Sequence, residues 1–123
     1  MDCDCFGCVG GKETDLLAIF QRPAGDRVAI HIEVKQPTDS LKREQAEAYR
    51  MRARCWTEKP HTKMIPHTDA IAVLLCSETK LPVYEPHLEY FDKVLTFEDI
   101  KRLFPTYRNR FGQLPKAQLD VRH

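Results

Sequence analysis

The stretch "VAIHIEVKQ", residues 28–36, decides the fold that we expect for this chain. Apolar and polar residues alternate along it, and this period of two predicts a β-strand whose two faces differ. One face is entirely β-branched, as expected for a face that covers a core: Val28, Ile30, Ile32 and Val34. The opposite face carries His31, Glu33 and Lys35, three titratable side chains of mixed sign. This second face therefore has the composition of a functional site.

A second strand precedes this one and forms a hairpin with it. Residues 13–21, "ETDLLAIFQ", are rich in apolar side chains, and "RPAGD" at 22–26 is a Pro/Gly turn. With the loop centred near Ala24, residues whose numbers sum to about 48 face one another in an antiparallel pair. Asp15 is then expected opposite Glu33, with both side chains on one face of the sheet.

A helix is expected over residues 41–56, which contain no Gly or Pro and several strong helix formers. Asp39 or Ser40 is the expected N-cap. One stripe of this helix mixes packing residues with hydrogen-bonding groups: Leu41, Gln45, Ala48, Tyr49, Arg52 and Trp56. The helix is followed by a Pro/His loop at 57–68 and by the apolar strand "DAIAVLLCS", which predicts a crossover to a parallel position.

The rest of the chain predicts smaller elements. Residues 80–90 hold two prolines, so any strand there should be peripheral. "DKVLTFEDIKRLF" predicts a short strand and then a helix, with Thr96 and Asp99 at capping-box spacing. We therefore expect one α/β domain over residues 1–123, with a mixed β-sheet, an N-terminal β-hairpin, a crossover helix and flanking helices. Residues 1–12 are expected to be a flexible lead-in and 105–123 a basic tail.

Composition indicates a soluble globular protein, with 123 residues, 42% hydrophobic and 30% charged. The longest apolar run, "AIAVLL", is far shorter than the roughly 20 residues that span a bilayer, and the N-terminus has no signal pattern. No membrane partner is expected, and the cytoplasm is the expected location.

The net charge of +1 hides two basic blocks, residues 41–63 and 101–123, which alternate with two acidic ones. A basic patch on the surface could serve a phosphate-bearing partner. A solvated helix face and a basic tail would account for the same pattern.

The five cysteines are odd in number and scattered, which indicates a reducing compartment rather than a disulfide framework. Cys55 and Cys76 stand in apolar surroundings and are expected to be inert core residues. Cys3, Cys5 and Cys8 form a C-x-C-x-x-C cluster that could hold zinc or an iron–sulfur centre, but no fourth ligand is evident. Free thiols are the preferred interpretation.

The hairpin supplies the ligands that a magnesium-type cation prefers, which are oxygens from one or two carboxylates. Asp15 and Glu33 would provide the carboxylates, and the backbone carbonyl of Val34 a further oxygen. Lys35 lies about 7 Å beyond Glu33 on the same strand face, where its ammonium could stabilise a phosphoryl transition state. A surface salt bridge among these side chains on a solvated sheet is the alternative.

The stretches "ETDLLAIF", "IHIEVK" and "QAEAY" together resemble the PD-(D/E)XK phosphodiesterase superfamily over about residues 13–76. Asp15 precedes an E-x-K formed by Glu33 and Lys35, and the Q-x-x-x-Y of Gln45 and Tyr49 is similar to the RecB-like branch. The resemblance implies a restriction-endonuclease-like core. It also implies that the two acidic residues are metal ligands, that the lysine is catalytic, and that the Q-x-x-x-Y residues support the site or touch the substrate.

The chain departs from this pattern at its beginning. The superfamily usually has a helix ahead of the first core strand, often with another acidic or histidine residue for the site, and residues 1–12 do not read as a helix. Glu13 falls on the same strand face as Asp15 and could substitute. His31 shares the expected active face, where we interpret it as a neighbour that hydrogen-bonds a ligand.

These residues predict a nuclease that hydrolyses DNA phosphodiester bonds with Mg²⁺ or Mn²⁺ as cofactor. Phosphate contacts are expected from Arg50, Arg52, Lys59 and Lys63. A homodimer or a partner protein is possible, since no base-reading module is evident. One alternative is a binding module with the nuclease fold but no turnover, or a subunit completed by another chain. Another is a metal-cluster protein built on Cys3, Cys5 and Cys8.

Overall fold

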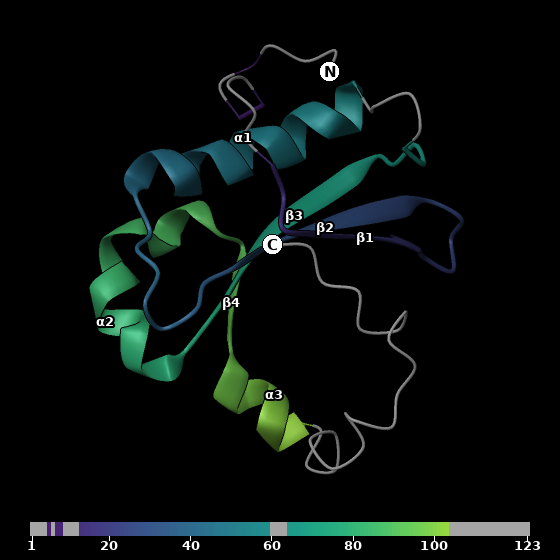
Figure 1. Cartoon of the computed structure of the whole chain (residues 1–123). Helices are drawn as coiled ribbons and strands as arrows, with labels where there is room; N and C mark the ends of the chain where they lie inside the picture. Colours follow the sequence, from purple (N-terminus) through teal and green to yellow (C-terminus); the bar gives the residue numbers. More distant parts are fainter. Residues whose placement is uncertain (1–4, 6, 9–12, 60–63, 104–123) are drawn as a thin grey trace.

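The computed structural model describes residues 5, 7–8, 13–59 and 64–103. They form an α/β structure with a four-stranded mixed sheet in the order β1-β2-β3-β4 (Figure 1). The strands are β1 (Leu16–Gln21), β2 (Arg27–Val34), β3 (Asp69–Cys76) and β4 (Lys93–Thr96). The helices are α1 (Arg43–Glu58), α2 (Leu81–Tyr84) and α3 (Phe97–Leu103), with 3-10 helices η2 (Glu78–Lys80) and η3 (Glu85–Tyr90). The predicted basic tail and most of the predicted lead-in lie outside the described residues.

The predicted hairpin and its register are confirmed. β1 and β2 are antiparallel, and the pairs run from Leu16 with Ile32 to Gln21 with Arg27, so that the residue numbers sum to 48. Gly25 closes the turn with a φ of 99°, a conformation that glycine adopts without strain. β1 begins at Leu16 rather than at residue 13, because the N–H of Asp15 is donated to a helix side chain instead of to the neighbouring strand.

The predicted crossover is also confirmed. β2, α1 and β3 form a unit in which the two strands are parallel neighbours, with Glu33 beside Leu74. The N-cap prediction was wrong, since the helix begins at Arg43 with Lys42 as its cap. Asp39 instead accepts the backbone N–H of Gln36 and closes a turn before the helix.

The segment 80–90 is helical rather than a peripheral strand. Its two prolines stand in the first turns of α2 and η3, where the missing N–H costs nothing. Tyr84 explains why the segment folds back: its ring is buried in the core, and its hydroxyl donates to the carbonyl of Asp39 at 2.6 Å. After it, β4 and α3 follow as predicted, and the capping box is present, with Asp99 N–H donated to Thr96 Oγ1 at 2.9 Å and Thr96 N–H donated to Asp99 Oδ2 at 3.0 Å.

The expectation about the faces of β2 was wrong. Its β-branched face is only half-buried, whereas His31 and Glu33 on the polar face are 0% and 6% exposed. The reason is that α1 lies across the polar face (Figure 1), where Trp56 and Tyr49 contact these two side chains. The titratable groups of β2 are therefore held between sheet and helix rather than on an open surface.

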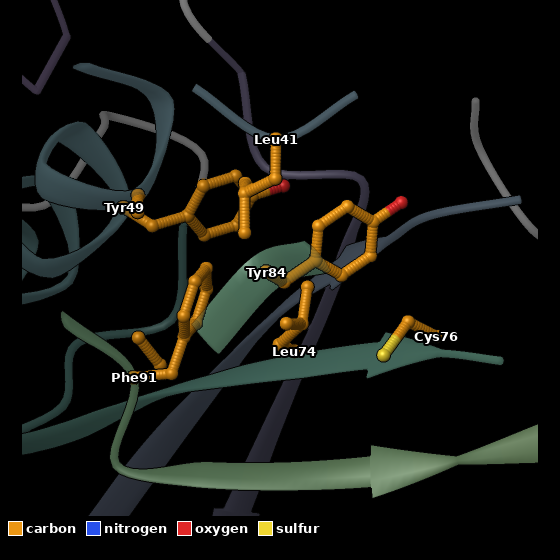
Figure 2. Packing of buried hydrophobic residues seen from close by; sticks show 8 residues of the cluster. Leu41, Tyr49, Leu74, Cys76, Tyr84 and Phe91 are labelled. Carbon is orange, nitrogen blue, oxygen red and sulfur yellow. The ribbon is translucent and has the colours of Figure 1, made fainter. Parts of the chain in front are cut away.

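The hydrophobic core lies between the sheet, α1 and the helical segment 78–90. Figure 2 shows Tyr49 from α1, Leu74 from β3, and Tyr84 and Phe91 converging on it. The rings of Tyr49 and Phe91 are 6.1 Å apart, within the range of favourable aromatic pairs. The packing fixes α1 over the sheet and so fixes the side chains that α1 directs at β2. Among the described residues, no helix is both long and apolar enough to cross a membrane.

Candidate active site

A pocket of about 650 Å³ opens where β2 ends and α1 begins. Its lining combines four acidic side chains with one lysine, so the pocket is rich in oxygen atoms that could coordinate a cation. The residues that line it are Glu13, Asp15, Glu33, Val34, Lys35, Gln36, Asp39 and Gln45. The structure therefore brings together, in one pocket, every residue that was predicted to bind the metal or to act in catalysis, except Tyr49.

Asp15 is held at both its backbone and its side chain. Its N–H is donated to the hydroxyl of Tyr49 at 2.7 Å, and its Oδ2 accepts the backbone N–H of Val34 at 2.9 Å. The carboxylate thus continues the β1–β2 ladder in place of a backbone carbonyl. Because the N–H and C=O of a strand residue point the same way, the carbonyl of Val34 faces this side as well.

Glu33 is the most perturbed group in the pocket. Burial raises its pKa from 4.5 to about 8, helped by the hydrogen bond that its protonated form donates to Asp15 and by the negative charge of Asp15. Lys35 and the hydrogen bond from Tyr49 act in the opposite direction. Two carboxyls that face each other in a desolvated place do not both ionise readily. At neutral pH and without a cation, Glu33 therefore keeps a proton that it shares with Asp15.

Lys35 lies between a carboxylate and an amide. Its Nζ is 3.5 Å from Glu33 Oε2 and 3.5 Å from Gln45 Oε1. The same amide oxygen accepts the backbone N–H of Lys42 at 3.0 Å, which anchors Gln45 at the beginning of α1. Gln45 therefore orients the ammonium of Lys35, although its own side chain is largely exposed.

Tyr49 lies behind the pocket wall and connects its two acidic residues. Its hydroxyl accepts the N–H of Asp15 and has one proton to donate, which Glu33 Oε1 receives at 3.0 Å. Burial and the charge of Glu33 raise the pKa of Tyr49 far above its ordinary value, so the phenol stays protonated. Within this geometry Tyr49 is a positioning group.

Arg52 was predicted to contact phosphate, and this was wrong. The guanidinium is buried and donates to Thr14 Oγ1 at 2.9 Å and to the carbonyl of Glu13 at 2.8 Å, with a further bond to the carbonyl of Gly7. It also stacks on the ring of Tyr49, with Cζ 4.4 Å from the ring centroid. Arg52 therefore joins the residues before β1 to α1. The sequence signal was its place on the apolar stripe of the helix.

The structure places His31 away from the pocket, contrary to the expectation that it hydrogen-bonds a ligand. Its Nδ1 lies 2.8 Å from Thr14 Oγ1, and its ring centroid lies 5.1 Å from that of Trp56. Burial, together with the charges of Arg52 and His67, lowers the pKa of His31 to about 3. His31 is a neutral packing residue beneath α1.

The remaining predicted site residues are Glu13 and the other expected phosphate contacts, and they lie in different places. Glu13 is exposed and lines the pocket, as its expected role requires. Arg50 and Lys59 are exposed on α1, although Arg50 also donates to the carbonyl of Glu89 at 3.3 Å. Lys63 lies outside the described residues.

The described cysteines separate into two groups. Cys76 is buried in the core, as predicted. Cys55 was predicted to be inert as well, but its thiol lies in one cluster with those of Cys5 and Cys8, a possible metal site in which the three sulfurs are within 4.8 Å of one another. Cys3 lies outside the described residues.

No protein-family model matches this chain, and no curated protein or solved structure matches it significantly. The chemistry of the site is therefore inferred from its side chains. Two coupled carboxyls, an outward backbone carbonyl and an oriented ammonium in one open pocket could bind a divalent cation and hold an anionic group beside it.

Proposed function

We propose that this chain is a metal-dependent nuclease, with a restriction-endonuclease-like core of the PD-(D/E)XK type, that hydrolyses DNA phosphodiester bonds. The observation that carries the proposal is the pairing of Asp15 and Glu33 in one pocket with Lys35 beside them. The order of these residues in the sequence, followed by Gln45 and Tyr49 on the next helix, supports it.

The carboxyl pair fits a hard divalent cation. Glu33 keeps its proton because it is buried and faces another acid, and a cation between the two would favour the ionised form of both. The residues that would hold Mg²⁺ or Mn²⁺ are Asp15 and Glu33, with the carbonyl of Val34 and, at the rim, Glu13. When bound, the cation would supply Lewis-acid polarisation of the phosphate and a water of lowered pKa.

The remaining residues of the pocket position groups for this reaction. Lys35 carries a positive charge that Gln45 and Glu33 direct toward the pocket, where it would stabilise negative charge on a phosphoryl oxygen. Tyr49 holds Asp15 and Glu33 at a fixed separation without entering the pocket. Charges that are preorganised in this way stabilise a transition state more than mobile surface groups do, because they do not have to reorganise during the reaction.

DNA is proposed as the partner because α1, which begins at the pocket, has an exposed basic side. Arg43, Arg50 and Arg54 are exposed along the helix and could follow a phosphate backbone. A small anionic substrate would need no such extended surface.

Titration calorimetry with Mn²⁺, together with cleavage of single- and double-stranded DNA oligonucleotides, tests the proposal. We expect Mn²⁺ binding and metal-dependent cleavage in the wild type, and loss of both in Asp15→Ala and Glu33→Ala. Glu44→Ala is the matched control, because Glu44 is an exposed acid in the first turn of α1 that does not line the pocket. Absence of carboxylate-dependent Mn²⁺ binding would refute the metal site. Binding without cleavage of any DNA would instead favour the non-catalytic binding module or the subunit that needs another chain.

A further inference from the structure

A second cluster of ligating side chains lies at the C-terminal end of α1, whereas the pocket lies at the beginning of this helix. The sulfurs of Cys5, Cys8 and Cys55 are within 4.8 Å of one another, and those of Cys5 and Cys8 are 3.4 Å apart. The first two come from a C-x-x-C turn, in which the N–H of Cys8 is donated to the carbonyl of Cys5 at 3.0 Å. The third comes from the last turns of a helix that is remote in sequence.

The turn is built onto α1 rather than resting beside it. A Cβ on Gly7 would lie 2.4 Å from the backbone nitrogen of Arg52 and 2.5 Å from the carbonyl of Ala48, so only glycine allows this approach. The buried guanidinium of Arg52 donates to the carbonyl of Gly7. Cys8 is buried against Trp56. The chain thus holds two thiols over the third by backbone contacts as well as by side-chain packing.

We propose that Cys5, Cys8 and Cys55 bind a single zinc ion through their thiolates, with a water molecule in the fourth position of the tetrahedron. In a tetrahedral site with Zn–S bonds of about 2.3 Å, the sulfurs are about 3.8 Å apart. The 3.4 Å between Cys5 and Cys8 and the upper limit of 4.8 Å for all three sulfurs bracket this value. An iron–sulfur cluster would need wider separations, because several iron and sulfide atoms stand between its cysteines. A disulfide would join only two of the sulfurs and would not explain why the third lies beside them.

This zinc site is independent of the proposed nuclease function, since it shares no ligand with the pocket. Its role would be structural: it would fasten the segment before β1 to α1, in parallel with the hydrogen bonds of Arg52 to Glu13 and Thr14. Closing a loop between Cys8 and Cys55 restricts the unfolded chain and stabilises the folded one. The zinc would thereby also restrict the position of the chain segment that leads into Asp15.

Metal analysis of the full chain, purified under reducing conditions, tests the site directly. We expect about one zinc per chain, released only when the thiols are titrated with a mercurial reagent. In Co²⁺-substituted protein, thiolate ligands should produce an intense near-ultraviolet charge-transfer band. Iron in place of zinc, or protein with no bound metal and freely reactive thiols, would overturn the proposal.

Variants assign the zinc to these residues. Cys5→Ser and Cys55→Ser should each lower the bound zinc severalfold, whereas Cys76→Ser should keep it, because Cys76 is a buried cysteine in the separate core. Glu33→Ala should also keep the zinc, which separates this site from the carboxylate pocket. If a cysteine variant does not fold, the Co²⁺ spectrum of the wild type still decides the question. Zinc retained in folded Cys55→Ser protein would contradict the assignment.

Discussion

The phenol oxygen of Tyr49 lies 3.0 Å from Oε1 of Glu33, across the contact between α1 and β2. This hydrogen bond joins α1 to Glu33, the carboxyl of β2 whose pKa is most strongly shifted. The same phenol oxygen accepts the N–H of Asp15, which joins α1 to the residue just before β1 as well. A single buried hydroxyl therefore sets the relative positions of the two acidic residues. Its removal should affect the geometry of the pocket more than the packing of the core.

Tyr49→Phe tests this role, because it removes the hydroxyl and keeps the ring that packs against Phe91. We expect the free energy of unfolding to fall by about 1–3 kcal/mol, since the N–H of Asp15 and a buried carboxyl lose a partner. Denaturant unfolding measures the change. Tyr90→Phe is the control, since its hydroxyl accepts only an exposed bond from Arg43 and should cost about 1 kcal/mol or less. Equal effects of the two substitutions would contradict the linking role.

The raised pKa of Glu33 predicts that the metal-free protein loses stability as the pH rises. The folded state holds the proton up to about pH 8, whereas the unfolded chain releases it near the ordinary pKa of 4.5. Stability from this group is therefore complete below pH 4.5 and is lost between pH 4.5 and 8. Because His31 has the opposite dependence below pH 6.5, the net fall in the wild type should come between pH 6.5 and 8 and amount to about 1–2 kcal/mol.

Glu33→Gln cannot ionise, so its free energy of unfolding should not fall in that pH range. Denaturant titrations at several pH values, in the presence of a chelator, provide the comparison. Adding Mn²⁺ to the wild type should also remove the fall, because a bound cation favours the ionised carboxyl. A wild-type profile parallel to that of Glu33→Gln would show that Glu33 ionises normally.

The lowered pKa of His31 predicts the opposite dependence. The unfolded chain takes up a proton below its ordinary pKa of 6.5, whereas the buried imidazole resists it down to about pH 3. Stability is therefore lost as the pH falls from 6.5 toward 3. Between pH 4.5 and 6.5 the dependence from Glu33 has the opposite sign, so the wild type should be nearly flat there.

The Glu33→Gln background isolates this effect, because only the histidine dependence then remains. In that background the stability should fall with acid, and His31→Asn should flatten the profile, since an Asn oxygen can accept from Thr14 in place of Nδ1. The slope with pH is the measurement, because the smaller side chain lowers the overall stability through a cavity. An unchanged slope would mean that His31 is not held neutral.

Much of the fold could be predicted from local patterns. The turn at 22–26 fixed the register that places Asp15 opposite Glu33, and the order of β2, α1 and β3 followed from an apolar strand after a helix. The strand periodicity also separated the two faces of β2 correctly. It could not show which face the helix covers, because both faces contain residues that can be buried once partners are supplied.

The errors at the site have the same cause. Histidine and arginine are residue types that are common on surfaces and in ligand-binding sites, yet His31 and Arg52 are both buried. His31 is buried against Thr14 and Trp56, which are distant in sequence. Arg52 is buried because it donates to the carbonyls of Gly7 and Glu13. A buried polar side chain is stable only where such partners exist, and the partners are known only from the tertiary structure. The thiol cluster with Cys55 was missed for the same reason.

Lys35→Ala is the most direct test of the proposed chemistry. If the ammonium acts on the transition state, cleavage of DNA should fall by about 10²–10⁴-fold, while Mn²⁺ still binds to Asp15 and Glu33. Lys42→Ala is the control, because Lys42 is an exposed lysine at the beginning of α1 that does not line the pocket. Calorimetry and a cleavage assay on the same preparations separate binding from turnover. Cleavage at the wild-type rate in folded Lys35→Ala protein would remove this residue from the reaction and leave Asp15 and Glu33 to account for it.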